Sequence, residues 1–360
     1  MASHHIDTGN HPPIAEPLRR HPKIYLDVID DSINRLVDAG ICEPCNLPWA
    51  ANIVLVKKKD SAVPRVTVDF RKLNEITLKD KFPLPRISDC LDALSGAVYF
   101  SSIDQSHSFF QLPLATEEDR NKTAFITRRG QFRFTRLPMG ASNSPSVFAR
   151  LMTLVLYGLT YLCCLVFNDD CIVMSRSFDD HLHHVGLVLQ RFRQARLKLK
   201  PSKCHLFQRR LKFLGHIVSG QGVEVNPDKV ATILAWPFPQ NITELRGFLG
   251  LCNYYRSFCP NFSAVVEPLS EMLHKGVRIE PTERRMAAFN ALKAMLTTPP
   301  TLAMPNDEGE WVVDVDCSAF AMGAVAQQWQ NGELKVIEYA SRTLNRAERS
   351  YCATRRDCWR

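Results

Sequence analysis

Two short apolar runs separated by three polar residues constrain the fold of this chain more than any other feature. Tyr161–Phe167 and Cys171–Ser175 have the length and composition of β-strands, and Asn168-Asp169-Asp170 lies between them. Two such runs joined by an Asn/Asp turn predict a β-hairpin. The predicted hairpin carries two adjacent carboxylates at its tip, where a tight turn projects them beyond the sheet.

Helical and β-rich patterns are interspersed along the rest of the chain. Helices are predicted over residues 23–39, 87–94, 144–158 and 179–196, and mostly helical structure over 226–298. Strands are predicted over 52–57, 65–69, 98–104, 109–114, 211–219, 222–225, 311–315, 321–329 and 334–339. Residues 1–18 are polar, contain proline and show no periodicity, so a flexible N-terminal arm is expected. This order of elements favours an α+β protein with antiparallel sheet.

A third carboxylate, Asp104, ends the predicted strand 98–104. If that strand pairs beside the hairpin, Asp104 joins Asp169 and Asp170 in one cluster. Such a cluster repels itself unless cations neutralise it, and Mg²⁺ or Mn²⁺ are the natural partners of oxygen ligands. Two such ions would activate an attacking hydroxyl and stabilise a leaving pyrophosphate. An isolated Asp-Asp pair is also a common turn sequence.

The chain has 360 residues and a formal net charge of +8. A basic balance suits a polyanionic partner, because neutralising phosphates releases counterions. A basic surface kept for solubility explains the same balance. The sequence has no apolar run of about eighteen residues and no signal peptide at its start, so neither a membrane span nor a membrane partner is expected. With twelve scattered cysteines, an intracellular location is expected, in a cytoplasmic particle or the nucleus.

Ten segments, in order, resemble the reverse transcriptases of gypsy-type LTR retrotransposons. They are PWAANIVLVKKKD (48–60), VDFRKLN (68–74), FPLPRI (82–87), FSSID (100–104), FFQLPL (109–114), KTAFIT (122–127), FTRLPMG (134–140), FNDD (167–170), FLGHIVS (213–219) and LRGFLGLCNYYRSFCPNF (245–262). One such fragment would be weak, but ten in the right order are very specific. The resemblance implies a right-hand polymerase with fingers and palm over 19–225, thumb and connection helices over 226–298, and a truncated RNase H-like domain over 299–360.

The resemblance also assigns site residues. Asp104, Asp169 and Asp170 would be the catalytic aspartates that bind two Mg²⁺ or Mn²⁺ ions. The positions that would contact the incoming dNTP are Lys58, Arg65, Phe109 and Met139. The segment that would hold the primer and template is Phe213, Leu214, Gly215 and His216. The implied partners are dNTPs and an RNA or DNA template with its primer.

The resemblance is less complete at two places. Where the family has Tyr-X-Asp-Asp with an apolar X, this chain has Phe167 and Asn168. Near the C-terminus, Asp316 and Asp357 match the first two acidic ligands of RNase H, but the second is a glutamate in the family and no later acid follows. We therefore expect no RNase H activity from this chain.

Three functions remain open on the sequence. An active RNA-directed DNA polymerase agrees with the three aspartates, Lys58, Arg65 and Phe109. A weakly active or inactive nucleic-acid-binding relic agrees with Asn168 and with the shortened C-terminal domain. Another template-dependent polymerase, such as a viral RNA-dependent one, agrees less well because of Phe109 and the RNase H-like start.

Overall fold

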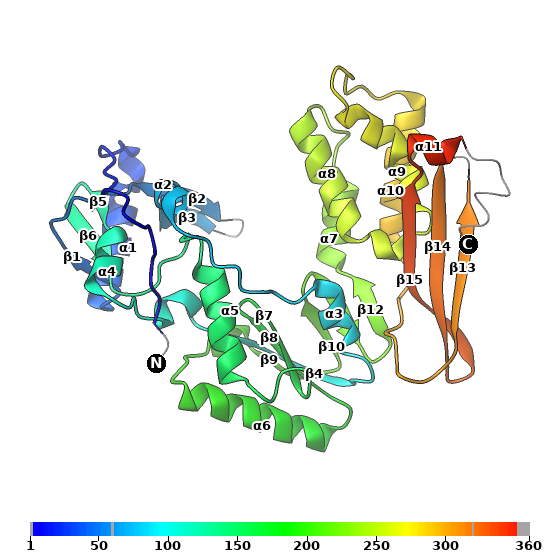
Figure 1. Ribbon diagram of the computed structural model, residues 1–360, viewed down its shortest axis with the longest axis horizontal. Helices are drawn as coiled ribbons and strands as arrows, with labels where there is room; N and C mark the ends of the chain where they lie inside the picture. The colour runs from blue at the N-terminus through cyan, green and yellow to red at the C-terminus, as the bar shows by residue number, and fades with distance from the viewer. Residues whose placement is uncertain (1–2, 59–60, 319, 351–360) are drawn as a thin grey trace. The chain divides into compact units, whose positions relative to one another are not determined.

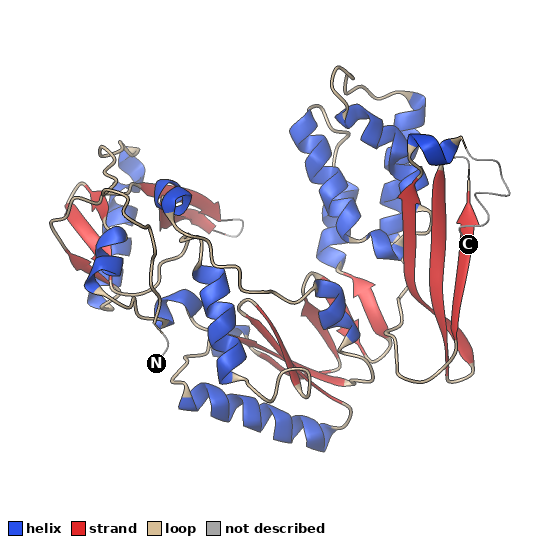
Figure 2. Ribbon diagram, in the orientation of Figure 1, coloured by secondary structure: helices blue, strands red, loops and turns tan. Residues whose placement is uncertain are grey.

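A computed structural model describes residues 3–58, 61–318 and 320–350, apart from the side chains of residues 58, 61, 62 and 346. The chain divides into two compact units (Figure 1). Unit 1 contains the chain up to Pro85, Ser102–Val173 and Leu182–His205. Unit 2 contains Arg86–Ser101, Met174–His181 and the chain from Leu206 onward. Helices and antiparallel sheets occur in both units (Figure 2), which confirms the predicted α+β class.

Unit 1 contains small sheets and the helices that cover them. Its first sheet has the order β1-β6-β5, and β2 pairs with β3 as a separate hairpin. The bounds of these strands are β1 Cys42–Pro44, β2 Ile53–Lys58, β3 Ser61–Val68, β5 Phe125–Thr127 and β6 Gly130–Phe134. The helices are α1 Leu26–Asp38, α2 Arg71–Ile76, α4 Glu117–Lys122 and α5 Ser144–Val155. As the sequence predicts, α5 begins at Ser144 with Pro145 in its first turn, where the missing N–H costs nothing.

The predicted hairpin is confirmed and belongs to a four-stranded sheet of order β7-β8-β4-β9. Its strands are β7 Cys164–Phe167, β8 Asp170–Ser175, β4 Tyr99–Asp104 and β9 His205–Gln208. In unit 1, side chains of α5 and of α6 (Phe178–Gln194) share one buried core with residues of β4, β7 and β8. That core covers one face of the sheet and leaves the carboxylates at the end of β4 and at the hairpin tip partly exposed.

Unit 2 combines helices with two three-stranded sheets. The first sheet is β10 Arg210–Phe213, β11 His216–Ser219 and β12 Gly222–Val225; the second is β13 Trp311–Cys317, β14 Ala321–Gln330 and β15 Glu333–Thr343. The helices are α3 Ile87–Asp92, α7 Pro227–Ala235, α8 Ile242–Tyr254, α9 Phe262–Ser270, α10 Glu283–Thr297 and α11 Arg346–Arg349. Helix α9 packs against β14 and β15 (Figure 1).

Three predictions about local structure are wrong. The arm expected to be flexible is packed onto unit 1: Ile6 is only 2% exposed, and its N–H donates to Asp119 Oδ1 at 2.8 Å. Residues 109–114 do not form a strand, because the chain turns at His107 (φ 48°) and enters a 3₁₀ helix over Ser108–Gln111. The predicted strand 211–219 is split by positive φ angles at Leu214 and Gly215, which end β10 and start β11.

Candidate active site

The hairpin register places the acidic pair at the end of the sheet. Phe167 pairs with Asp170, so Asn168 and Asp169 form a two-residue loop. Asn168 has a left-handed backbone (φ 55°), which asparagine adopts more readily than apolar or β-branched residues do. This geometry supplies a local reason for asparagine at a position where the family motif has an apolar residue.

Strand β4 lies next to β8 in the sheet, so Asp104 is brought toward the acidic tip. The electrostatics agree: the pKa of Asp170 is raised by desolvation and by the negative charges of Asp169 and Asp104, while Lys203 lowers it. Burial raises the pKa of the adjacent Cys171 thiol to about 12, so that thiol stays neutral beneath the carboxylates. The negative charges of Asp104 and Asp169 therefore both act on Asp170.

A lysine that the sequence reasoning missed neutralises part of this cluster. Lys203 Nζ lies 3.0 Å from Asp104 Oδ2, and both side chains are partly exposed. The available signal was the basic segment that follows α6, in which Lys and Arg recur without any Asp or Glu between positions 191 and 212. In that segment only tertiary structure shows which cation meets Asp104.

The carboxylate chemistry fits hard divalent cations, since all three side chains offer oxygen ligands and the negative charges of two of them raise the proton affinity of the third. Their present arrangement is open: among the described residues, no three acidic, His or Cys side chains are grouped closely enough to hold a metal ion. The ammonium group of Lys203 is the cation that contacts the Asp104 carboxylate.

The positions predicted to contact the nucleotide lie in unit 1, and three of their side chains are described. Arg65 is exposed on β3, opposite Val56. Phe109 is half-buried, with its ring edge-on to Phe148 of α5 at 5.8 Å between centroids. Met139 is also half-buried. The side chain of Lys58 lies outside the described residues.

The segment predicted to hold the primer lies in unit 2, at the β10–β11 turn. Phe213 and His216 are buried (5% and 4% exposed), so only Leu214 and Gly215 present surface. Two tyrosine hydroxyls hold this turn: Tyr254 donates to Leu214 O at 2.5 Å and Tyr255 to Gly215 O at 2.6 Å. The turn is therefore fixed in place by α8 and the residue that follows it.

Of the two residues predicted for RNase H, the structure describes only one. Asp316 is exposed on β13, and Asp357 lies outside the described residues. The sheet β13–β15 itself forms with regular antiparallel pairing, broken by one irregularity near Ala326 and Gln327.

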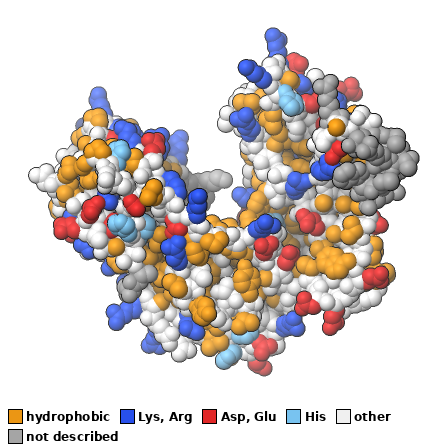
Figure 3. All heavy atoms as spheres, viewed as in Figure 1, with side chains coloured by type: hydrophobic (Ala, Val, Ile, Leu, Met, Phe, Trp, Pro, Cys, Tyr) orange, Lys and Arg blue, Asp and Glu red, His pale blue; other side chains and the backbone are white. Residues whose placement is uncertain are grey.

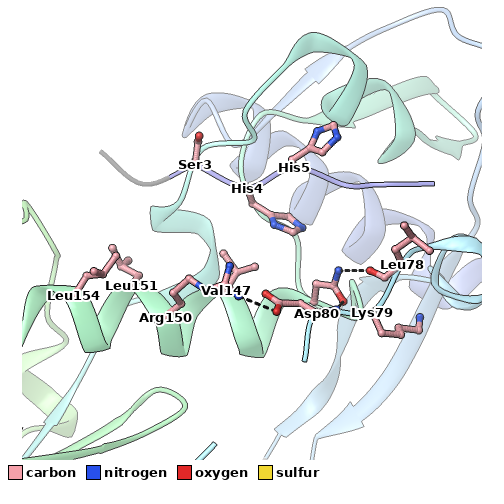
Figure 4. Close-up of a pocket in the computed structure, with 11 residues that line it drawn as sticks. Ser3, His4, His5, Leu78, Lys79, Asp80, Val147, Arg150, Leu151 and Leu154 are labelled. Atoms are coloured by element: carbon pink, nitrogen blue, oxygen red, sulfur yellow. Dashed lines mark hydrogen bonds and ion pairs between the residues drawn. The ribbon is translucent and has the colours of Figure 1, made fainter. Parts of the chain in front are cut away.

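One pocket of unit 1 contains none of the predicted site residues. It has a volume of about 340 Å³ and lies between residues 3–5, residues 78–80 and helix α5 (Figure 4). An ion pair between Arg150 and Asp80, with 2.8 Å between nitrogen and oxygen, closes one side. The packed N-terminal segment supplies the ring of His4, whose pKa is lowered mainly by burial.

Family comparisons define the class of protein. Residues 56–218 match the model described as reverse transcriptase (RNA-dependent DNA polymerase), and residues 282–359 match the RNase H-like domain found in reverse transcriptase. The fold agrees: the foamy viral protease-reverse transcriptase in complex with double-stranded DNA superposes with a TM-score of 0.89 at 24% identity, over 99% of this chain and 62% of that one. The same viral protein in complex with an RNA/DNA hybrid gives 0.85, over 99% of this chain and 48% of that one. The right-hand polymerase fold is therefore confirmed.

Curated relatives narrow the class to one kind of element. The Pol polyprotein of transposon 297 from Drosophila melanogaster is 35% identical over 98% of this chain, and that of transposon gypsy from the same organism is 32% identical over 92%. This chain spans about a third of the length of each (33% in both). The chain therefore carries a reverse transcriptase domain and an RNase H-like domain, and over most of its length it is similar to part of the Pol polyproteins of gypsy-type retrotransposons.

Proposed function

We propose that this chain is an RNA-directed DNA polymerase that adds dNTPs to a primer 3′-hydroxyl by two-metal phosphoryl transfer. The observation that carries the proposal is the placement of Asp104, Asp169 and Asp170 at the end of β4 and at the tip of the neighbouring β7–β8 hairpin, inside the segment that matches reverse transcriptases.

The three aspartates would hold the divalent ions. When bound, such ions supply Lewis-acid stabilisation of the attacking and leaving oxygens. The chain's own part is to fix the carboxylates on adjacent strands and to balance their charge. Arg65 and Lys58 would contact the triphosphate, with the planar fork of arginine suited to phosphate oxygens. The Phe109 ring would lie under the sugar, and Met139 would line the base-pair pocket.

A primed template is the proposed macromolecular partner. The net charge of +8 favours a polyanion, and Lys and Arg side chains are spread over both units on the face shown in Figure 3. Two solved structures with this fold are complexes of the foamy viral protein, one with an RNA/DNA hybrid and one with double-stranded DNA. The Leu214–Gly215 turn, fixed by two tyrosine hydroxyls, would contact the primer end.

A second candidate is a nucleic-acid-binding relic that polymerises poorly. Two buried polar groups beside the aspartates favour it: Asn168 Oδ1 and both amide atoms of Gln105 make no hydrogen bond with any described residue. An unpaired buried polar atom costs about 1–3 kcal/mol. Such costs are tolerated at working active sites, but they also accumulate in a chain released from selection.

Primer extension separates the two candidates. Poly(rA) primed with oligo(dT) is incubated with dTTP and either Mg²⁺ or Mn²⁺, and the unaltered chain is compared with Asp169→Asn. Extension by the unaltered chain that disappears in the variant supports the polymerase. Duplex binding without extension by either metal overturns the polymerase and supports the relic. In that case Asn168→Leu tests whether this one side chain causes the loss.

A further inference from the structure

The chain after α6 carries a row of exposed cations next to the carboxylate cluster. Within unit 1, the exposed basic residues of this segment are Arg191, Arg193, Arg196, Lys198, Lys200 and Lys203. No Asp or Glu interrupts them. Only Lys203 makes an ion pair with a described residue, and its partner is Asp104.

Backbone pairing fixes which of these cations share a face with Asp104. Gln105 and Leu199 form an antiparallel bridge, flanked by hydrogen bonds from Ser106 N to Lys198 O and from Lys200 N to Asp104 O, both 2.9 Å. In such a ladder Lys200 lies across from Asp104, and Lys198 across from Ser106. Cross-strand neighbours project to the same face.

Burial shows which face that is. Gln105 is 5% exposed and Leu199 packs against the core of unit 1, so the bridged pair points inward. Successive residues of extended chain point to opposite faces. Lys198 and Lys200 therefore project outward, on the same side as the Asp104 carboxylate, about 7 Å apart along the chain. Both are exposed.

Tertiary contacts hold this segment in position. The amide of Gln111 brackets Lys198, accepting from its N–H at 2.7 Å and donating to its carbonyl at 2.9 Å. Lys200 is tied to Asp104 through the backbone. The two outward side chains are free to bind a ligand, since neither makes a side-chain hydrogen bond or ion pair with the residues that the structure describes.

From this juxtaposition we propose that Lys198 and Lys200 form a polyphosphate-binding site at the edge of the carboxylate cluster. Its ligand is the phosphate chain of the incoming nucleotide before transfer, and the pyrophosphate after it. This inference rests on the proposed polymerase function and adds two residues to the predicted nucleotide contacts, which are Lys58, Arg65, Phe109 and Met139.

The charge pattern favours a compact polyphosphate over a nucleic-acid backbone. Lysine ammonium groups are compact point charges that rotate freely onto phosphate oxygens. The two unpaired lysines lie on the same face as Asp104, whose carboxylate Lys203 already contacts. Arg191 and Arg193 flank the buried Phe192 on α6 and so point to different sides of that helix.

The test measures binding of inorganic tripolyphosphate to the full chain by titration calorimetry, at low salt with Mg²⁺. Lys198→Gln combined with Lys200→Gln is expected to weaken binding about threefold to thirtyfold, the range for two exposed charge contacts. The matched control, Arg191→Gln with Arg193→Gln, removes the same charge from α6 and is expected to change binding by less than about twofold. Lys198→Arg with Lys200→Arg is expected to restore most of the affinity.

Equal losses in the glutamine pair and in the α6 control would reduce the effect to net charge and overturn the site. Unchanged binding in the glutamine pair, or no binding by the unaltered chain, overturns it as well. A separate arm measures affinity for a primed duplex against salt. A fall of about two in the salt slope in the lysine variant would assign the lysines to the nucleic-acid backbone instead.

These outcomes are distinct from failure of the polymerase proposal. A chain that binds tripolyphosphate through the two lysines but extends no primer keeps this inference and loses the other. A chain that extends primers but binds tripolyphosphate equally well without the two lysines keeps the polymerase proposal and loses this inference.

Discussion

The region beside the aspartates and the sheet β13–β15 each contain a buried glutamine, but only the glutamine in β13–β15 has hydrogen-bond partners for its amide. Gln328 of β14 is fully buried, yet its amide oxygen accepts from Asn306 N at 3.0 Å and its amide nitrogen donates to the carbonyls of Asn306 and Glu308. Gln105, next to Asp104, is 5% exposed and neither amide atom has a partner among the described residues.

Their carboxylates differ as well. Asp104 forms an ion pair with Lys203, and its negative charge helps to raise the pKa of Asp170 after desolvation. Asp316 is exposed on β13, and its carboxylate forms no ion pair with any residue that the structure describes. The comparison teaches that unfavourable groups concentrate where several strands bring charges together, whereas the regular sheet satisfies its polar groups. Stability is given up beside the aspartates and kept at Gln328 of the sheet β13–β15.

The sharpest test of this contrast removes one carboxylate from each sheet. Asp104→Asn is expected to lower primer extension about 10³-fold or more, because a lost metal ligand removes several kcal/mol of transition-state stabilisation. Asp316→Asn, the matched control, is expected to leave extension unchanged within about twofold. Initial rates on a primed template check both, and equal losses would break the distinction between the two sheets.

Replacing the satisfied glutamine is expected to destabilise unit 2. Gln328→Leu leaves the N–H of Asn306 and two carbonyls without their partner at part-buried positions, at an expected cost of about 1–3 kcal/mol. Amide hydrogen exchange, resolved by segment, measures the opening free energy of β13–β15. If protection there is unchanged, the hydrogen bonds of Gln328 contribute no net stability.

Replacing the unsatisfied glutamine is expected to do the opposite. Gln105→Leu removes two unpartnered polar atoms from the core of unit 1 and should stabilise that unit by about 1–3 kcal/mol. Gln111→Leu is the control, because its amide brackets Lys198 and also donates to Ser106 O at 2.7 Å. That variant should be destabilised. Amide hydrogen exchange of unit 1 measures the stability of both variants. If Gln105→Leu is destabilised, the Gln105 amide has a hydrogen-bond partner in solution.

The smallest expected effect concerns Asp170 and pH. Its pKa is raised in the folded chain, by desolvation first and by Asp169 and Asp104 next. The folded state therefore holds the proton more tightly than the unfolded state, so this contribution to stability is present at acidic pH and is lost as pH rises through the raised pKa.

Asp170→Asn should consequently raise the melting temperature at pH 7 by at most about 2 °C, because the side chain is exposed and screened. Below the ordinary aspartate value of 3.8 the difference should vanish. Melting curves at several pH values check this. A gain that persists at acidic pH would point to a cause other than charge.

Much of the fold could be predicted because its signals are local. The β7–β8 hairpin, with its acidic tip, follows from two apolar runs around an Asn/Asp turn, and α5 follows from the helical pattern of 144–158 with Pro145 in its first turn, although Asn143 and not Ser144 is the N-cap residue. The motif order also indicated all three aspartates of the candidate site.

The expectation about membrane spans concerned helix length and hydropathy. In the part of the chain that the structure describes, no helix combines the length and the apolar character that crossing a membrane requires.

Other features depended on contacts between distant positions. Ile6 and His4 look like part of a polar arm until residues near Pro113 and Asp119 pair with their backbone. Phe109–Leu114 reads as a strand, but the aromatic rings fill the core around Phe148 and Phe134 from a 3₁₀ turn. The periodicity of a sequence shows which residues are apolar, but it does not show which other residues pack against them.

The sequence by itself determined the class of the protein and indicated the three aspartates of the candidate site, because those are carried by short motifs whose local geometry is set by turn and strand propensities. Only the tertiary structure decided which basic side chains lie near those aspartates. Lys203 on Asp104, and Lys198 and Lys200 on the same face, result from a bridge between Gln105 and Leu199. That pairing joins residues almost a hundred positions apart, and its register is set by burial on one face of the sheet, which no local pattern records.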